Sequence, residues 1–170
     1  MKAIVEEGKA DVNTPDTKSR TPLMIACETG NLEIIKYLVS KGASVHDLKK
    51  QKKNALIKAT MNGHIHIVSF LLKHGIHPDL PDSSGNTAVH YAAGYGWTHI
   101  LKFLIEEGKA HPDLKNDWNS SPAMVAMLKG HFGNLEYLLS LKNVESSLVD
   151  SEGRSVVSQL CMNFNKETLT

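Results

Sequence analysis

An internal repeat of 33 or 34 residues constrains what this chain can fold into more than any other feature of its sequence. The positions that recur at this spacing are Gly30, Gly63 and Gly96, then Gly42, Gly75 and Gly108, and the aromatic residues Tyr37, Phe70, Phe103 and Tyr137, each followed by a leucine. One extra residue is inserted near Lys109. A repeat of this length is typical of stacked supersecondary units, in which each unit contacts only its neighbours. We therefore expect an elongated array instead of a fold around one central core.

The stretch Asp82–Gly108 shows how one unit is built. Its pattern predicts a turn at 82–85, a short helix opened by Thr87, a glycine-containing loop at 94–96 and a second, apolar helix at Ile100–Glu107. Helices of about 10 residues are too short to be stable alone in water, so they need to pack against neighbouring units. One unit by itself is not expected to fold.

The segment Thr87–Ala93, which reads TAVHYAA, is similar together with Gly96 to the T-P-L-H-x-A signature, and the whole chain resembles the ankyrin repeat family. The resemblance implies an all-α solenoid of stacked helix-turn-helix pairs with projecting β-turn or hairpin loops, in a single domain. The register predicts a partial repeat at 1–14, full repeats at about 16–46, 49–79, 82–113 and 116–147, and a truncated repeat at 150–170. Because both ends lack part of a unit, we expect a fragment of a longer array or of a larger protein.

Departures from the family pattern identify units that differ from the rest. Only one unit keeps the signature histidine, His90, and the resemblance implies that its side chain pairs with Thr87. In the fifth unit Gly133 and Asn134 replace the apolar start of the second helix, and Lys142 stands where other units close with glycine. We expect the array to be locally weaker there.

Composition places the chain among ordinary intracellular domains. A net charge of +1 creates no strong field, so it does not favour nucleic acid or acidic lipid as a partner. No apolar run reaches the roughly 18 residues that a membrane helix needs. The two cysteines, Cys27 and Cys161, fall on small-residue helix positions, which suits reduced packing thiols. We expect a monomeric domain in the cytoplasm, the nucleus or both, without membrane insertion.

The family resemblance implies that a protein or peptide partner binds along the turn tips and the first-helix side of a groove. Tyr95 and Trp118 stand out because neither has an obvious framework role and aromatic anchors are enriched in binding hot spots. The alternative for Trp118 is that it packs on its neighbouring turn. The predicted partner-binding residues are Arg20, Lys50, Lys53, Met61, Asn86, Tyr95, Trp118 and Leu128.

Other chemistries are less well supported by the sequence. The basic turn Lys49–Lys53 could dock an acidic segment or phosphate groups, or could be a solvated turn. His64 and His66 are two residues apart, which points their rings away from each other on a helix, so we expect no metal site and no cofactor. Asn13 resembles the hairpin asparagine that is hydroxylated in some ankyrin proteins.

No nucleophile, base and orienting group come together in a way that the repeat register does not already explain. The predicted function is therefore a non-catalytic protein-protein interaction scaffold or adaptor. The alternative from another class is a substrate-recruiting ankyrin targeting module of a larger signalling enzyme.

Overall fold

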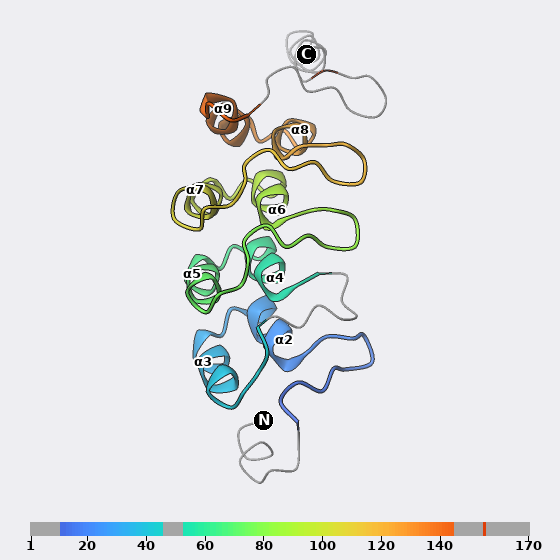
Figure 1. The fold of residues 1–170 in the computed structure, drawn as a ribbon, viewed down its shortest axis with the longest axis vertical. Coiled ribbons are helices and arrows are strands. Elements are labelled where there is room, and N and C mark those ends of the chain that lie inside the picture. Colours follow the sequence, from blue (N-terminus) through green and yellow to red (C-terminus); the bar gives the residue numbers. More distant parts are fainter. Residues whose placement is uncertain (1–10, 46–52, 145–154, 156–170) are drawn as a thin grey trace, which may run out of the picture.

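The computed structural model describes residues 11–45, 53–144 and 155. Within these ranges each pair of helices consists of a first and a second helix joined by a tight turn. The pairs are α2 (Pro22–Thr29) with α3 (Leu32–Ser40), α4 (Ala55–Met61) with α5 (Ile65–Lys73), α6 (Ala88–Gly94) with α7 (Thr98–Glu106), and α8 (Pro122–Leu128) with α9 (Phe132–Ser140). Figure 1 shows these pairs stacked along one axis, with the second helices in one row, the first helices in another, and the loops projecting beyond the first helices. The predicted all-α solenoid is confirmed.

The first helices begin where a side chain caps the free backbone N–H groups. Thr21 Oγ1 accepts a hydrogen bond from the backbone N–H three residues later at 3.3 Å, and Pro22 follows at the first helical position. Ser121 repeats this arrangement in the last described pair. In the unit that lacks a Thr-Pro pair, Asn54 Oδ1 accepts from the corresponding N–H at 2.9 Å, while its Nδ2 donates to the carbonyl of Leu80 at 3.1 Å. Asparagine therefore caps this helix and also ties it to the next loop.

The turns between paired helices need glycine for two reasons. Gly30, Gly63 and Gly96 have positive φ angles of 82°, 76° and 76°, which side chains rarely adopt. A ring from the following unit also lies directly over each turn, so that a Cβ added at Gly30 would be 2.6 Å from a ring carbon. The rings that cover these glycines are those of His64, Trp97 and His131 respectively.

The second glycine column behaves differently at the insertion. Gly42 and Gly75 have φ angles of 86° and 84°, but in the following unit the positive φ, 57°, belongs to the inserted Lys109. Gly108 is instead required by close approach, because a Cβ there would be 2.7 Å from the carbonyl oxygen of Leu104.

The core is a ladder of equivalent positions along the stack. The leucines that follow the aromatic column are at most 1% exposed, and the aromatic residues themselves are half-buried in every unit. Each buried leucine contributes about 1.5–3 kcal/mol relative to exposure. Small residues of the first helices allow close packing between units, and burial raises the pKa of the Cys27 thiol to about 12, as expected of a packing cysteine. The ladder consists of Leu38, Leu71, Leu104 and Leu138 on the second helices and of Ala26, Ala59, Ala92 and Ala126 on the first helices.

Asn134 is accommodated inside this core although it replaces an apolar residue. Its side chain is 1% exposed, and Nδ2 donates to the carbonyls of Ala92 and Ala93 at 3.1 and 3.2 Å. These carbonyls lie in the last turn of α6, and the Ala92 carbonyl also accepts from the backbone N–H of Trp97 at 3.0 Å. The polar residue thus links α9 to the preceding pair, and the lower local stability expected of this unit remains a prediction.

Candidate functional site

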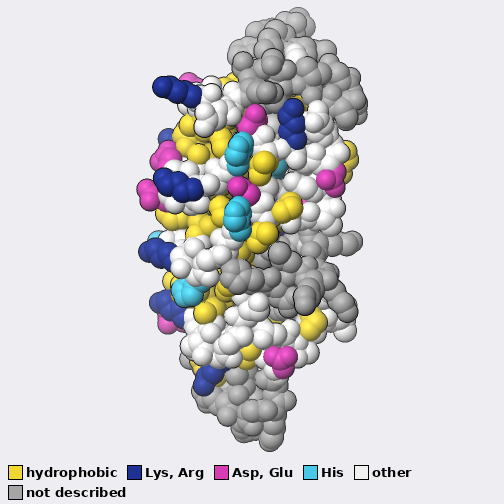
Figure 2. Space-filling view, viewed as in Figure 1, with side chains coloured by type: hydrophobic (Ala, Val, Ile, Leu, Met, Phe, Trp, Pro, Cys, Tyr) yellow, Lys and Arg dark blue, Asp and Glu magenta, His cyan; other side chains and the backbone are white. Residues whose placement is uncertain are grey.

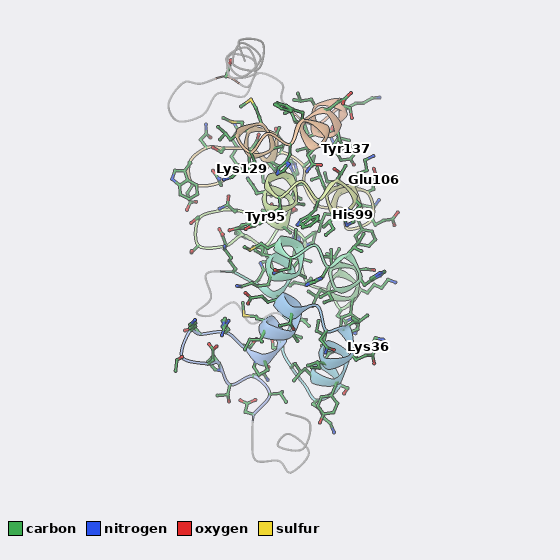
Figure 3. The ribbon with its side chains drawn as sticks, turned by 180° about the vertical axis from the view of Figure 1, so that it is seen from behind. Lys36, Tyr95, His99, Glu106, Lys129 and Tyr137 are labelled. Carbon is green, nitrogen blue, oxygen red and sulfur yellow. The ribbon has the colours of Figure 1, made fainter. Side chains whose placement is uncertain are left out.

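One surface of the stack is formed by the exposed sides and C-terminal ends of the first helices. The corresponding residues in every unit are half-buried or exposed, so this surface is open to a partner. We call it the groove face and define it by Ile25, Glu28 and Thr29 on or after α2, Lys58, Met61 and Asn62 on or after α4, Tyr91, Gly94 and Tyr95 on or after α6, and Val125, Leu128 and Lys129 on or after α8. In Figure 3, Tyr95 and Lys129 lie one above the other on the first-helix row, whereas Lys36, Glu106 and Tyr137 lie on the second-helix row.

The edge formed by the second helices has a different character. In Figure 2 lysine and arginine side chains along this edge lie among acidic ones. Tyr137 illustrates the arrangement: its hydroxyl donates to Glu106 Oε1 at 2.9 Å and the ammonium of Lys102 lies 5.2 Å from its ring centroid. Burial and the Glu106 carboxylate raise the pKa of Tyr137 to about 12. This edge is a mixed-charge, solvated surface whose aromatic side chains join one pair of helices to the next.

The loop before each first helix is shaped by an acceptor side chain at its start. Asp16 Oδ1 accepts from the backbone N–H groups of Lys18 and Arg20, both at 2.9 Å. The Arg20 N–H and guanidinium hold the pKa of this carboxyl below its usual value. Asp82 and Asn116 repeat the same pair of backbone contacts two and four residues on. The tips therefore have a defined geometry on which variable side chains are displayed.

Trp118 occupies one of these tips. The backbone of its loop is fixed to the neighbouring tip, because the backbone N–H of Asp117 donates to the carbonyl of Ser84 at 3.1 Å. The indole itself remains 56% exposed. The backbone of this loop packs on its neighbour, whereas most of the tryptophan surface faces solvent.

The N-terminal half of the groove face, with which we group Arg20 of the preceding loop, is charged and internally paired. Arg20 makes a 2.7 Å ion pair with Asp16 and a 3.8 Å ion pair with Glu28. Lys58 on the next first helix reaches the same Glu28 oxygen at 3.4 Å. Arg20, one of the predicted partner-binding residues, is thus held by carboxylates of its own chain.

The C-terminal half contains a cleft of about 400 Å³ between α6 and α8. Gly94 opens it: the corresponding positions carry Glu28, Met61 and Leu128, and a Cβ at Gly94 would be 2.8 Å from Val125 Cγ1. Tyr91 and Tyr95 are one helical turn apart, with ring centroids separated by 6.4 Å. The residues that line the cleft are Asn86, His90, Tyr91, Gly94, Tyr95, Val125 and Lys129.

His90 supports this cleft from beneath. Its Nδ1 accepts from the backbone N–H of Thr87 at 3.1 Å and lies 3.0 Å from the Thr87 hydroxyl. Because Nδ1 is an acceptor, Nε2 carries the proton and donates to the carbonyl of Ser120 at 3.1 Å. The ring is 2% exposed, and burial lowers its pKa, which favours the neutral form. The pairing of Thr87 with His90 that the family resemblance implied is confirmed, and the ring also joins α6 to the next loop.

Tyr91 is held in place by two contacts. Its hydroxyl donates to Asp82 Oδ2 at 2.6 Å, and the Lys53 ammonium lies 4.8 Å from its ring centroid. Burial, together with the neighbouring carboxylate, raises the pKa of Tyr91 well above its usual value. The phenol therefore remains a protonated donor, and its ring forms a fixed wall of the cleft.

The structure places the predicted partner-binding residues in several different environments. Tyr95, Trp118 and Leu128 are 48%, 56% and 52% exposed, which makes them three of the four large hydrophobic side chains exposed in the described ranges. Met61 is half-buried, Asn86 lines the cleft and accepts from Asn116 Nδ2 at 2.8 Å, Lys53 covers Tyr91, and Arg20 is ion-paired. Lys50, and with it most of the basic turn 49–53, lies outside the described residues. The role of all eight predicted residues in binding stays a prediction.

Tyr91 and Val125 line the cleft but are not among the predicted partner-binding residues. Tyr91 lies four residues before Tyr95, so the helical spacing was a signal that both face the same side. Val125 has no comparable signal, because only packing between α6 and α8 brings it to Gly94. Phe132, 42% exposed at the start of α9, was also missed and lies outside the groove face.

Asn13 is engaged by the following unit. Its Oδ1 accepts from the backbone N–H of Ser44 at 2.8 Å, and Nδ2 donates to the carbonyl of Gly42 at 3.2 Å. Both ends of the amide thus hold the first loop against the next one. Hydroxylation of Asn13 remains a prediction. Elsewhere in the described ranges, no three His, Cys, Asp or Glu side chains form a group that could hold a metal ion.

A stack of capped helix pairs that presents a continuous surface defines the class of repeat solenoids. A family model described as ankyrin repeats (3 copies) matches residues 1–82 and 76–150. The chain belongs to the ankyrin repeat family. Domains of this family are in general non-catalytic modules for protein-protein interaction.

A curated protein also matches part of the chain. The chain is 41% identical over 46 residues to alpha-latrocrustotoxin-Lt1a from Latrodectus tredecimguttatus. The match covers 27% of this chain and 3% of the toxin, so the chain spans only a small part of that relative's length.

The described helices have seven to nine residues, far short of the roughly 20 that cross a bilayer, and none of them can span a membrane.

Proposed function

We propose that this array is an interaction scaffold that binds a protein or peptide partner through the C-terminal half of its groove face and the adjoining loop tip. The observation that carries the proposal is the placement of its exposed apolar side chains. Tyr95, Trp118 and Leu128 lie around the cleft-bearing helices α6 and α8, while the N-terminal half of the face has no large hydrophobic side chain exposed among its described residues. Exposed aromatic anchors beside a concave site are typical of binding hot spots.

Rigidity supports the same function. Cap hydrogen bonds, the His90 contacts and the Tyr91–Asp82 hydrogen bond hold the cleft walls before any partner arrives. A preformed surface loses little conformational entropy on association, so more of the contact energy remains as affinity. The array therefore acts by presenting a fixed surface instead of folding around its partner.

Partner capture by the wild-type chain and by the double variant Tyr95→Ala/Trp118→Ala tests the proposal. Both side chains are about half exposed, so the double variant should keep the helical circular dichroism of the wild type while losing the partner. Phe132→Ala is the matched control, because it removes an exposed aromatic ring outside the groove face. Equal capture by the wild type and a folded double variant would place the binding surface elsewhere.

A substrate-recruiting module of a larger enzyme would use the same surface. Determining whether the native protein also carries a catalytic domain distinguishes such a module from a free-standing adaptor.

A further inference from the structure

Two lysines flank the cleft without carboxylate partners. Lys129, which follows α8, is one of the residues that line the cleft. The Lys53 ammonium lies over the ring of Tyr91, which forms a wall of the cleft, 4.8 Å from the ring centroid. None of the ion pairs among the described residues involves either lysine, whereas Arg20 and Lys58 on the same face are both paired with Glu28. The positive charge around the cleft is therefore available to a ligand.

The Asp82 carboxylate contacts the cleft wall but makes no ion pair with either lysine. Asp82 Oδ1 accepts two backbone hydrogen bonds at 2.9 Å, and Oδ2 accepts the Tyr91 hydroxyl at 2.6 Å. These hydrogen bonds hold the carboxylate in place without removing its negative charge. No Asp or Glu is among the described residues that line the cleft, so neither ammonium group has a direct carboxylate contact there.

Aromatic and aliphatic side chains form much of the cleft wall, together with Asn86 and His90. Tyr91, Tyr95 and Val125 surround the space that Gly94 leaves open. A volume of about 400 Å³ is near the lower limit for ligand sites, and it suits one large side chain better than a cofactor. Lys129 is exposed, so its ammonium can meet a charge beside that side chain.

From this arrangement we infer that the cleft takes an acidic peptide segment in which a large apolar side chain is flanked by Asp or Glu residues. The apolar side chain enters the space above Gly94. The carboxylates on either side of it pair with Lys53, beside the Tyr91 ring, and with Lys129, which follows α8. Complementary charge of this kind sets which partner is accepted and how fast it associates. This inference rests on the proposed function and specifies the chemistry of the partner.

Selection from a phage-displayed library of random linear peptides tests the inference without assuming a natural partner. The peptides enriched on the wild-type chain should carry an apolar residue flanked by acidic ones. A synthetic peptide of the enriched sequence should bind about tenfold or more weakly to Lys129→Glu and to Lys53→Glu. Raising the salt concentration from about 50 to about 300 mM should also weaken it.

The matched control is Lys36→Glu, which changes net charge by the same amount on α3, away from the groove face (Figure 3). Its affinity for the peptide should stay within about twofold of the wild type, because exposed charges beyond a Debye length are screened. A loss equal to that of Lys129→Glu would show only a general charge effect and would overturn the inference.

Two further outcomes separate this inference from the proposed function. Enrichment of neutral or basic peptides whose binding is lost in Tyr95→Ala would refute the acidic ligand and leave groove binding standing. If neither selected peptides nor a natural partner depend on Tyr95, the proposed function fails together with the inference.

Discussion

The two halves of the groove face use polar groups in opposite ways. In the N-terminal half the charged side chains of the surface are paired with one another, because Glu28 joins Arg20 and Lys58. In the C-terminal half none of the ion pairs among the described residues involves Lys53 or Lys129, and buried His90 and Asn134 join neighbouring units from within. Tyr95 and Leu128 remain exposed on this half. The same repeat thus yields one half whose surface charges are ion-paired and another half that exposes apolar side chains and unpaired lysines.

The largest expected effect concerns the buried support of the C-terminal half. Replacing His90 by alanine leaves the Thr87 N–H and the Ser120 carbonyl without their partner and opens a cavity under the cleft. We expect the free energy of unfolding to fall by about 3 kcal/mol. Urea denaturation followed by circular dichroism measures this. A loss below about 1 kcal/mol would mean that the ring is not the main support of this half.

The next largest effect should be a difference between the two halves in how much a substitution weakens partner affinity. Leu128→Ala removes a 52% exposed side chain from the C-terminal half, and we expect partner affinity to fall about tenfold with little change in stability. Arg20→Ala, in the N-terminal half, should change affinity by about twofold or less, because that guanidinium is already ion-paired. Titration calorimetry with the captured partner compares them. The reverse order of effects would assign binding to the charged half.

Acidification should weaken the C-terminal half specifically. Burial lowers the pKa of His90 below its ordinary value of 6.5, so the unfolded chain binds this proton more readily than the folded one. The stability contributed by the neutral ring is therefore complete above pH 6.5 and is lost as the pH falls from there through the folded pKa. The urea midpoint should decline over this window in the wild type more steeply than in His90→Met, which carries the residue found at Met24 and Met124. Parallel profiles would exclude His90 as the source.

The smallest effect is expected from the surface ion pairs. Glu28→Gln removes the shared partner of Arg20 and Lys58, whose side chains are 35% and 19% exposed. We expect a loss of about 1 kcal/mol or less, which high salt should reduce further. Thermal unfolding at low and high salt provides the measurement. A loss as large as that of His90→Ala would remove the distinction between the two halves.

Repeat spacing alone predicted the order of elements, because side chains at equivalent positions must enter equivalent slots of a stack. The glycine and leucine columns, the helix start at Thr87, and the Thr87–His90 pair follow from local rules and the family resemblance. Tyr95 and Trp118 stood out in the sequence because neither has an obvious framework role, and Leu128 was predicted with them. The structure leaves all three exposed, and their role in binding stays a prediction. Local rules failed for the inserted residue, where Lys109 and not Gly108 takes the positive φ angle.

Tertiary structure decided what the groove face offers to a partner. Glu28 meets Lys58 across 30 positions of the chain, and Asn134 reaches Ala92 across 42, so neither contact is visible in any one unit. Val125 becomes a cleft wall only because Gly94 has no side chain to meet it. The spacing of a sequence determines which elements stack, but the contacts between units determine which charges are paired and which surface stays open.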